Sequence, residues 1–320
     1  MEQGLNYYNN FIKTFPDVHK LAKAPDSTVF KLWEGLGYYT RCRNLIASAK
    51  YISKELKGKF PNTYDDIKAL KGVGPYTAAA IASFAFSLPH AVVDGNVFRV
   101  LARVFGIDTP TDTAEGKKLF TALAEELLDK EQPGIYNQAI MDFGAVICKP
   151  AAPLCSSCVF SKTCVAYATN KVAALPVKEK KITIRKRWFW YLVPEYKNET
   201  AILQRTAKDI WQDLYEFPMI ETANEIPVKK ILQQAEKKNW ITKNGYELVA
   251  VSPLYKQQLS HQLIAGQFIK IKLKKKPAVK NNWQWLSKNK IAQLCLPAIH
   301  QPVFKRRGAA AVTVVSNDGN

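Results

Sequence analysis

The sequence predicts two domains, a helical one at the N-terminus and an α+β one behind it. A length of 320 residues suits two domains that each bury a core, and an apolar fraction of 47% is typical of globular proteins. Apolar side chains recur at helical spacing through about residues 1–165. Beyond residue 187 the pattern changes to short apolar or alternating runs, which are typical of strands.

The expected helices of the first part are marked by periodicity and by proline or glycine at their ends. Apolar side chains at helical spacing run from Leu5 to Phe15 and stop at Pro16, and a second helix opens after Pro25 and closes at Gly35. Further amphipathic helices are expected at residues 45–56 and 117–128, the latter with an apolar face made of Leu119, Leu123 and Leu127. Residues 78–86 are apolar nearly all round, which predicts a buried central helix.

The second part is expected to hold strands at residues 188–193, 200–204 and 263–273, with short helices at 229–238 and 289–294. A lysine-rich stretch with Pro176 precedes it and suits an exposed linker. The tail has no usable periodicity and is expected to be disordered. The predicted boundaries are therefore 1–168 for the helical domain, 169–186 for the linker, 187–300 for the second domain and 301–320 for the tail.

The net charge of +19 is unevenly distributed. Residues 1–170 carry 19 Lys and Arg against 16 Asp and Glu, whereas residues 171–320 carry 27 against 11. A nucleic acid partner explains such an excess, and a merely solvated lysine surface is the alternative. The longest apolar stretch, residues 78–88, is too short to span a bilayer, and no signal peptide is evident at the start. These features predict a cytoplasmic, reducing setting.

Four cysteines stand within seventeen positions in the spacing C-x6-C-x2-C-x5-C: Cys148, Cys155, Cys158 and Cys164. Thiolate-only ligation suits an iron–sulfur cluster or zinc, although zinc ribbons more often show two CxxC knuckles separated by a long loop. Here a single CxxC is flanked by wider gaps, which favours a group larger than one ion. Two disulfides or unrelated buried thiols are the alternative, and a reducing setting disfavours the disulfides. The spacing therefore predicts an iron–sulfur cluster.

Two further motifs stand upstream of the cysteines. Residues 72–74, Gly-Val-Gly, join two expected helices, and such a hairpin directs backbone N–H groups outward at a helix N-terminus, where they can bind a phosphate. An ordinary turn between helices is the alternative. Asp94 follows an apolar segment and precedes Gly95 and Asn96, so it is either the cap of the next helix or an acidic site residue.

Taken in order, the hairpin, the aspartate and the four-cysteine loop resemble the endonuclease III superfamily of DNA glycosylases over about residues 1–165. One position separates the branches of that superfamily. The bifunctional branch has a lysine nucleophile in a GVGxKTA pattern, whereas this chain has Tyr76 in GVGPYTA. Without that amine, Schiff-base chemistry and strand cleavage lose their nucleophile. Tyr76 resembles instead the tyrosine of the adenine DNA glycosylase (MutY) family.

Further segments are similar to the same family. Residues 33–41, WEGLGYYTR, match its W-x-GLGYY-x-R segment, in which Tyr38 would wedge beside the damaged guanine. Residues 203–218 are similar to the LLxxR…WxGLWEFP stretch of its C-terminal domain, which has a Nudix-like fold and inspects 8-oxoguanine. Leu259-Ser260-His261 resembles the F-S-H loop that reads the lesion, with Leu in place of Phe, although His261 alone is equally explained as a surface histidine. The acidic Nudix catalytic box is missing, so pyrophosphatase activity is not expected.

The resemblance implies a role for each matching residue. Asp94 would stabilise an oxocarbenium-like cation, while Asn96 and Tyr76 orient the sugar and the carboxylate. The four cysteines would hold one structural [4Fe-4S] cluster. The implied DNA-binding residues are Gly72, Val73, Gly74, Tyr38, Tyr39, Arg41, Arg99, Ser260 and His261.

The same resemblance also implies a missing group. The general acid of the family is a glutamate in an S-E-x-x-L-Q-Q-T segment upstream of the helix that here begins EQGLNYYNNF. The chain begins just after that segment, and Glu2 lies on the wrong side of the junction. An N-terminally truncated protein with impaired cleavage is therefore expected.

The fold class predicted in full is a mostly α helix-hairpin-helix glycosylase domain with an iron–sulfur loop, followed by an α+β Nudix-like domain. The resemblance implies a monofunctional DNA glycosylase that removes adenine mispaired with 8-oxoguanine or guanine. It would act as a monomer on double-stranded DNA, with no membrane involved. An endonuclease III-type glycosylase and lyase, or a non-catalytic lesion-binding protein, remain as alternatives.

Overall fold

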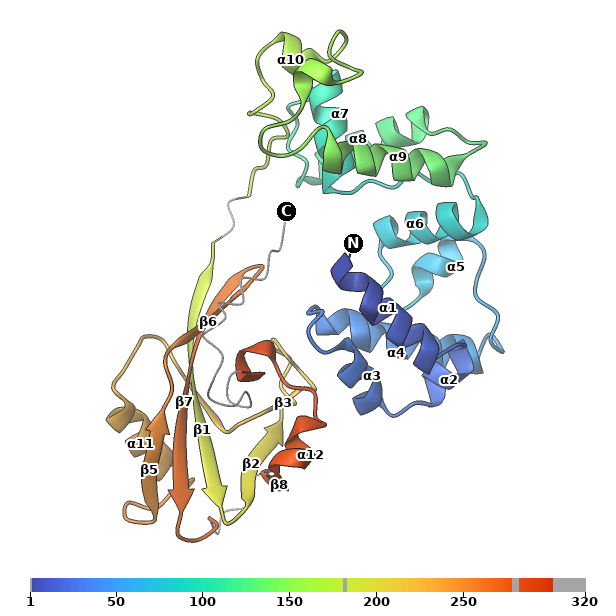
Figure 1. Cartoon of the computed structure of the whole chain (residues 1–320). Helices are drawn as coiled ribbons and strands as arrows, with labels where there is room; N and C mark the ends of the chain where they lie inside the picture. The colour runs from blue at the N-terminus through green and yellow to red at the C-terminus, as the bar shows by residue number, and fades with distance from the viewer. Residues whose placement is uncertain (1, 181–182, 278–281, 302–320) are drawn as a thin grey trace. The chain divides into compact units, whose positions relative to one another are not determined.

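The computed structural model describes residues 2–180, 183–277 and 282–301. The chain forms two compact units, a helical unit of residues 51–182 and a mixed unit that joins residues 1–50 to the chain from residue 183 on. Figure 1 shows their helices and strands. The tail that was expected to be disordered lies, beyond Gln301, outside the described residues. The domain boundaries expected from the sequence stay a prediction.

The helical unit is built from short helices with identifiable caps. Thr63 accepts a hydrogen bond from the backbone N–H of Asp66, and Thr113 accepts one from Gly116, so each begins a helix as an N-cap. The elements are α5 (Tyr64–Ala69), α6 (Pro75–Phe86), α7 (Gly95–Phe105), α8 (Ala114–Leu127), α9 (Pro133–Val146), η1 (Cys155–Ser157) and α10 (Val165–Ala168). The central core joins α7, α8 and α10 through buried side chains that include Leu101, Phe120 and Ala166.

Three expectations for this unit are wrong in detail. On α8 the buried apolar side chains are Phe120 and Ala124. Of the predicted face, Leu123 packs against the core, whereas Leu119 and Leu127 are 42% and 37% exposed, so the buried stripe is turned by one residue from the predicted one. On α6, Ala78, Ala79 and Ala82 are buried but Phe84 is 46% exposed, so this helix is not buried all round. Within the expected linker, Leu175 is buried against the central core, so this stretch is not wholly exposed.

The N-terminal part of the mixed unit holds α1 (Glu2–Thr14), α2 (Val18–Lys23), α3 (Asp26–Trp33) and most of α4 (Tyr39–Lys54). Phe11 and Phe15 of the first segment pack at the core, whereas Leu5, Tyr8 and Ile12 are exposed. Among the described residues, none of the helices is both long enough and apolar enough to cross a membrane.

The rest of the mixed unit is a twisted mixed sheet, eight-stranded within the described residues, with its strands in the order β3-β2-β1-β7-β5 and with β4, β6 and β8 pairing with β1, β7 and β2. The long central strands β1 and β7 run parallel, and the other pairs are antiparallel. The elements are β1 (Arg185–Tyr196), β2 (Glu199–Gln204), β3 (Tyr215–Glu216), β4 (Met219–Thr222), α11 (Val228–Lys237), β5 (Tyr246–Val251), β6 (Tyr255–Leu259), β7 (Gln262–Leu273), β8 (Gln284–Ser287), α12 (Lys288–Ala292) and η2 (Ala298–His300).

Strand β1 is buried on both faces, which explains its nearly continuous apolar sequence. Phe189 and Tyr191 belong to one core, while Trp190 and Leu192 belong to a second core that α11 covers. Helices followed by a mixed α+β part are the arrangement that the sequence predicts.

Candidate active site and cysteine loop

The glycine hairpin lies between α5 and α6. Gly72 has φ +78°, a conformation that glycine adopts without steric cost, and the backbone N–H of Val73 bonds to Leu70 O at 3.1 Å. Gly74 is the N-cap of α6 and supplies no side chain, and Pro75 occupies the first turn. The N-terminus of α6 therefore offers backbone N–H groups and the positive end of the helix dipole to an anion. Tyr76, also in this first turn, is 47% exposed.

Asp94 is the N-cap of α7, and three hydrogen bonds fix its carboxylate. Oδ1 accepts from the backbone N–H groups of Asn96 and Val97, both at 2.8 Å, and Oδ2 accepts from Asn96 Nδ2 at 3.0 Å. The residue is half-buried. Asp94 can therefore be both a helix cap and an acidic site residue, because the cap contacts orient a carboxylate that still reaches the surface.

Arg99 continues this network toward the cysteine loop. Its side chain is buried, and its Nη2 donates to Asn96 Oδ1 and to Gly144 O, each at 2.7 Å. Its Nε donates to Cys148 O at 2.7 Å. Burial lowers the pKa of the Arg99 guanidinium. This placement differs from the DNA contact expected for Arg99, because its donors are engaged inside the protein.

Sequence reasoning missed Gly144 on α9, which lets that helix approach Asn96. A Cβ at Gly144 would lie 2.7 Å from the Cβ of Asn96 and 3.1 Å from its carbonyl oxygen. Any side chain there would push Asn96 and hence the carboxylate that it bonds. A glycine inside an otherwise apolar helical stretch was the available signal.

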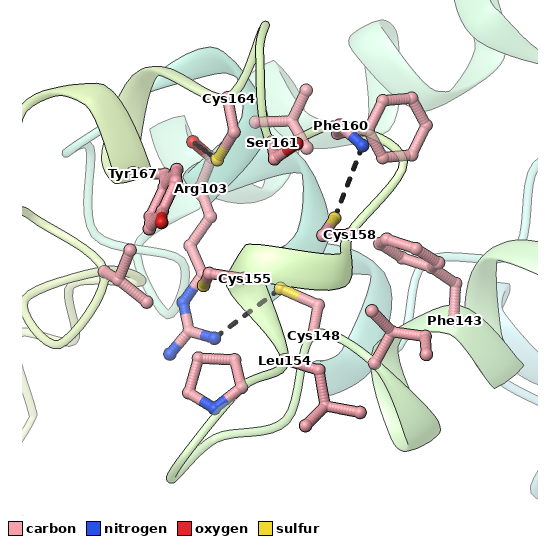
Figure 2. A pocket seen from close by; sticks show the side chains of 14 residues that line it. Arg103, Phe143, Cys148, Leu154, Cys155, Cys158, Phe160, Ser161, Cys164 and Tyr167 are labelled. Atoms are coloured by element: carbon pink, nitrogen blue, oxygen red, sulfur yellow. Dashed lines mark hydrogen bonds between the residues drawn. The ribbon is translucent and has the colours of Figure 1, made fainter.

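The four predicted cysteines line one pocket, whose wall also includes Arg103 and Phe143 (Figure 2). All four are outside disulfides and are half-buried. Several donors face the sulfurs: Arg103 Nη1 lies 3.5 Å from Cys148 Sγ, and the backbone N–H of Phe160 lies 3.4 Å from Cys158 Sγ. Such donors favour sulfur that carries negative charge.

The donor set of this pocket fits an iron–sulfur cluster better than one ion. Four thiols and no other ligand type meet at a pocket with mostly apolar walls. Yet among the described residues no three His, Cys, Asp or Glu side chains are grouped so that they could hold a single metal ion. A zinc ion would need its sulfurs about 2.3 Å from one centre. An iron–sulfur cluster is larger than one ion, so its four cysteines would not need to meet at one centre.

Arg103, which the sequence did not single out, holds the cysteine loop in place. It is 3% exposed, and its donors also reach the carbonyl oxygens of Lys149, Pro150 and Leu175 at 2.7, 3.1 and 3.0 Å. One side chain thus ties the start of the loop to a segment that follows its last cysteine. Its position on α7, four residues after Arg99, was the only hint in the sequence.

In the mixed unit the structure brings Tyr38 to Ser260, although 222 positions separate them: the Tyr38 hydroxyl lies 3.2 Å from Ser260 Oγ. Tyr38 has φ +46° and is 52% exposed, and the Arg41 guanidinium lies 4.6 Å from the centre of its ring. Tyr39 is buried instead, and its hydroxyl accepts from the backbone N–H of Gly35 at 3.3 Å. Ser260 and His261 are exposed in the two-residue turn between β6 and β7.

Known proteins match both parts of the chain. A family model described as "HhH-GPD superfamily base excision DNA repair protein" matches residues 1–126, and one described as "NUDIX domain" matches residues 189–306. An adenine DNA glycosylase of Buchnera aphidicola subsp. Baizongia pistaciae is 36% identical over 258 residues, which cover 80% of this chain and 70% of that protein. The chain belongs to the adenine DNA glycosylase family. This result confirms the predicted resemblance and the predicted fold class.

Other proteins that resemble this member of the adenine DNA glycosylase family match a smaller share of its chain. The human adenine DNA glycosylase is 44% identical over 162 residues, and the match spans 50% of this chain and 30% of the human protein. The Buchnera relative from Schizaphis graminum is 34% identical, with 64% of its length matched. A solved thermostable thymine-DNA glycosylase is 31% identical and covers 52% of this chain and 76% of its own, with a TM-score of 0.49.

Proposed function

We propose that this chain excises adenine mispaired with 8-oxoguanine or guanine in duplex DNA, by hydrolysis of the N-glycosidic bond. The observation that supports it most directly is the carboxylate of Asp94, half-buried and oriented by three hydrogen bonds. A group aimed in advance at developing positive charge lowers a barrier without reorganising during the reaction.

In the proposed reaction the adenine is flipped out of the duplex, at an unstacking cost of a few kcal/mol. As the glycosidic bond lengthens, positive charge grows on the sugar, and the Asp94 carboxylate stabilises it. Asn96 holds that carboxylate through its own side-chain amide. Tyr76 at the start of α6 helps to orient the sugar, and Gly72, Val73 and Gly74 bind a backbone phosphate.

Recognition is assigned to the mixed unit. Tyr38 and Arg41 lie beside the damaged guanine, the buried Tyr39 supports their segment from within, and Ser260 and His261 contact the lesion itself. The short distance between Tyr38 and Ser260, together with the positive φ of an exposed tyrosine, supports a shared contact surface. The positive charge from residue 171 on supports binding of a polyanion. We take the protein to be a monomer in a reducing, cytoplasmic setting.

The cysteine pocket is assigned to one [4Fe-4S] cluster, held by Cys148, Cys155, Cys158 and Cys164. When bound, this group supplies a rigid cross-link of the loop and takes no part in bond cleavage. Arg103 keeps the loop closed around the pocket, and Arg99 links the loop to Asn96 and through it to Asp94. Four irons per chain after anaerobic purification are expected, and zinc without iron would contradict the assignment.

Single-turnover cleavage of an 8-oxoguanine:adenine duplex tests the proposed reaction. Rates are measured for the chain as given and for the chain extended by an S-E-x-x-L-Q-Q-T segment, whose glutamate adds a general acid of the kind typically worth roughly 10²–10⁴-fold. In whichever of the two proteins cleaves the duplex, Asp94→Asn should abolish cleavage but keep mispair binding. The reason is that the charge of the Asp94 carboxylate acts on the transition state. If Asp94→Asn lowers mispair binding and the cleavage rate equally, Asp94 acts only as a helix cap.

A lyase is the main rival activity. The hydroxyl of Tyr76 cannot form a Schiff base, so borohydride should trap no covalent complex with DNA. Tyr76→Lys places an amine at this position of α6 and should create some trappable complex. A trapped complex with the unaltered chain would favour an endonuclease III-type activity.

A further inference from the structure

The exposed turn of Ser260 and His261 is tied to β1 on one side. Leu259 pairs with Gln262 across the turn, so only two residues separate β6 from β7. At the same end, β1 runs parallel to β7, and the backbone N–H of Arg185 donates to His261 O at 3.0 Å. The turn therefore projects from the end of the sheet where β6 stops and β7 begins. Its orientation depends on how the first residues of β7 are held.

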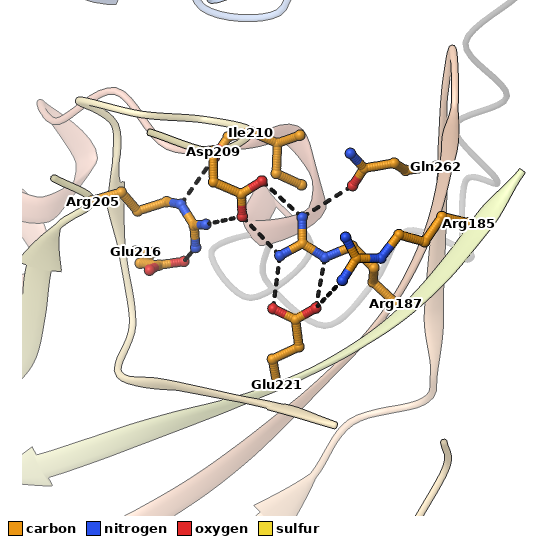
Figure 3. Close-up of polar contacts among 8 residues, drawn as sticks. All are labelled: Arg185, Arg187, Arg205, Asp209, Ile210, Glu216, Glu221 and Gln262. Carbon is orange, nitrogen blue, oxygen red and sulfur yellow. Dashed lines mark hydrogen bonds and ion pairs between the residues drawn. The ribbon is translucent and has the colours of Figure 1, made fainter. Parts of the chain in front are cut away.

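Arg187 of β1 holds those residues through its side chain (Figure 3). Its Nη1 donates to Gln262 Oε1 at 3.0 Å and to Asp209 Oδ1 at 2.9 Å. Its Nη2 donates to Asp209 Oδ2 and to Glu221 Oε2, and its Nε donates to Glu221 Oε1, each at 2.7 Å. A guanidinium has five N–H donors, so all of them are used.

The arrangement holds the guanidinium plane rigidly. Two bidentate carboxylate pairs fix it within its own plane, and the Phe189 ring lies 4.7 Å from its carbon. Its side chain is 6% exposed, and the bonds to Glu221 are the main reason why the pKa of Arg187 is raised. Gln262 therefore bonds to a group that cannot shift without breaking both carboxylate pairs.

Arg205 provides an internal comparison. It shares Asp209 at 3.1 Å, pairs with Glu216 at 2.7 Å and lies 5.9 Å from the Phe189 ring, with a side-chain exposure of 7%. A third bond runs from its Nε to Ile210 O at 3.0 Å, and Figure 3 shows Arg205 across Asp209 from Gln262. Buried ion networks in general add little to the free energy of unfolding. Stability alone therefore does not explain the bond from Arg187 to Gln262, whereas a role in positioning would.

We infer that Arg187, acting through Gln262, is a positioning residue for lesion discrimination: it fixes the turn that places Ser260 and His261 against the edge of 8-oxoguanine. The inference rests on the proposed function, which assigns lesion reading to that turn. Guanine and its 8-oxo form differ at one edge only, so telling them apart needs donors and acceptors held to within about 0.5 Å. Phosphate contacts elsewhere give affinity for both duplexes alike.

The test measures the ratio of dissociation constants for 8-oxoguanine:adenine and guanine:adenine duplexes, with the adenosine made non-cleavable by a 2′-fluoro group. Gln262→Met removes the acceptor with little change of volume, and Arg187→Lys removes the bidentate geometry but keeps the charge. Both variants lose the hydrogen bond between Arg187 and Gln262, and that loss should lower the preference for 8-oxoguanine about three- to tenfold. Arg205→Lys is the matched control, and it should lower the melting temperature but keep the ratio.

A double change separates positioning from general damage. If Gln262 acts through the turn, Gln262→Met should have no further effect on the ratio once Ser260 and His261 are both alanine. An unchanged ratio in Gln262→Met, or a loss matched by Arg205→Lys, overturns the inference. If the Ser260/His261 double alanine variant itself keeps full lesion preference, the reader turn of the proposed function fails as well, and the two failures are thereby distinguished.

Discussion

The helical unit and the mixed unit each bury a pair of arginines, and the two pairs face different acceptors. Arg99 and Arg103 donate chiefly to backbone carbonyl oxygens around the cysteine loop. Arg187 and Arg205 donate chiefly to the carboxylates of Asp209, Glu216 and Glu221. All four are less than a tenth exposed.

The difference lies in the charge that remains. A carbonyl oxygen satisfies an N–H donor but leaves the guanidinium charge in place, whereas a carboxylate cancels it. Beside the cysteines, two uncancelled cations are available to balance thiolate charge. Under the Ser260–His261 turn, three carboxylates face Arg187, Arg205 and the more exposed Arg185, which lies 3.9 Å from Glu221. The charges therefore balance, and what remains is the fixed direction of the hydrogen bonds. One pair is therefore suited to holding an anionic group and the other to orienting a neutral turn.

The largest effect is expected for Arg103→Met. This change removes the cation beside Cys148 and leaves three backbone carbonyls without their donor, at about 1–3 kcal/mol for each buried group. The variant should lose iron, which the iron-to-protein ratio after anaerobic purification measures. Arg205→Met removes an equally buried cation and should keep its iron. Full iron content in Arg103→Met would break the comparison.

Arg99→Gln should act on the reaction more than on the loop. The variant loses the bond from Nη2 to Asn96 Oδ1, together with the contacts to Cys148 O and Gly144 O. Asn96, and with it the Asp94 carboxylate, is then less well held. A displacement of about 1 Å can cost roughly 100-fold in rate, so single-turnover cleavage should fall roughly 10- to 100-fold with mispair affinity little changed. Gly144→Ala pushes Asn96 directly and should give a similar split. Equal rates for both variants and the parent would remove Arg99 from the site.

His300 sharpens the contrast, because within the described part of the chain this buried ring is bonded to neither a carbonyl oxygen nor a carboxylate. Among the described residues neither of its ring nitrogens, nor the nearby Tyr191 hydroxyl, has a hydrogen-bond partner. Burial lowers the pKa of His300 from 6.5 to about 3, with the Arg205 charge adding to the effect. The folded state therefore keeps this ring neutral.

Below pH 6.5 the unfolded chain binds a proton on His300, whereas the folded chain does not. The stability that comes from burying the neutral ring is therefore complete above the unfolded pKa and is lost as pH falls. The window runs from about pH 6.5 down to 3. At pH 4.5 the free energy of unfolding should be lower by about 3 kcal/mol on this account. Denaturant unfolding at several pH values measures it, and His300→Leu should flatten the profile. The exposed His261→Gln is the control, and a profile flattened equally by it would contradict the assignment.

Local signals carried most of what the sequence predicted correctly. Gly35 and Gly37 end α3 at φ +100° and +76°, and Gly72 turns the hairpin at +78°, since only glycine adopts these conformations freely. The strands expected at 188–193, 200–204 and 263–273 lie within β1, β2 and β7. The cysteine spacing brought four thiols to one pocket.

What the sequence did not predict depends on packing between distant elements. Whether Arg99 meets DNA or a carbonyl is decided by Gly144, 45 positions away, which lets α9 come close to α7. The partners of Arg187 come from a loop, β4 and β7, and no periodicity links those three segments. On α8 the predicted helical period is correct. The same amphipathic pattern is compatible with a buried face rotated by one residue, however, and packing against other elements buries Phe120 rather than Leu119.

The smallest effect concerns the lysines that follow β7, where pairing again separates similar residues. Lys276 pairs with Glu199 at 2.6 Å and lies 5.0 Å from the Trp285 ring, whereas Lys274 is exposed. A lysine that contacts a phosphate adds about 0.9 to the slope of log affinity against log salt concentration. Lys274→Gln should therefore reduce the slope more than Lys276→Gln, because a carboxylate already cancels the second charge. Glu199→Gln should release Lys276 and increase the slope, without changing the preference for 8-oxoguanine over guanine. Titration of duplex affinity between low and moderate salt gives all three slopes, and equal slopes for the two lysine variants would show that the pairing has no bearing on DNA binding.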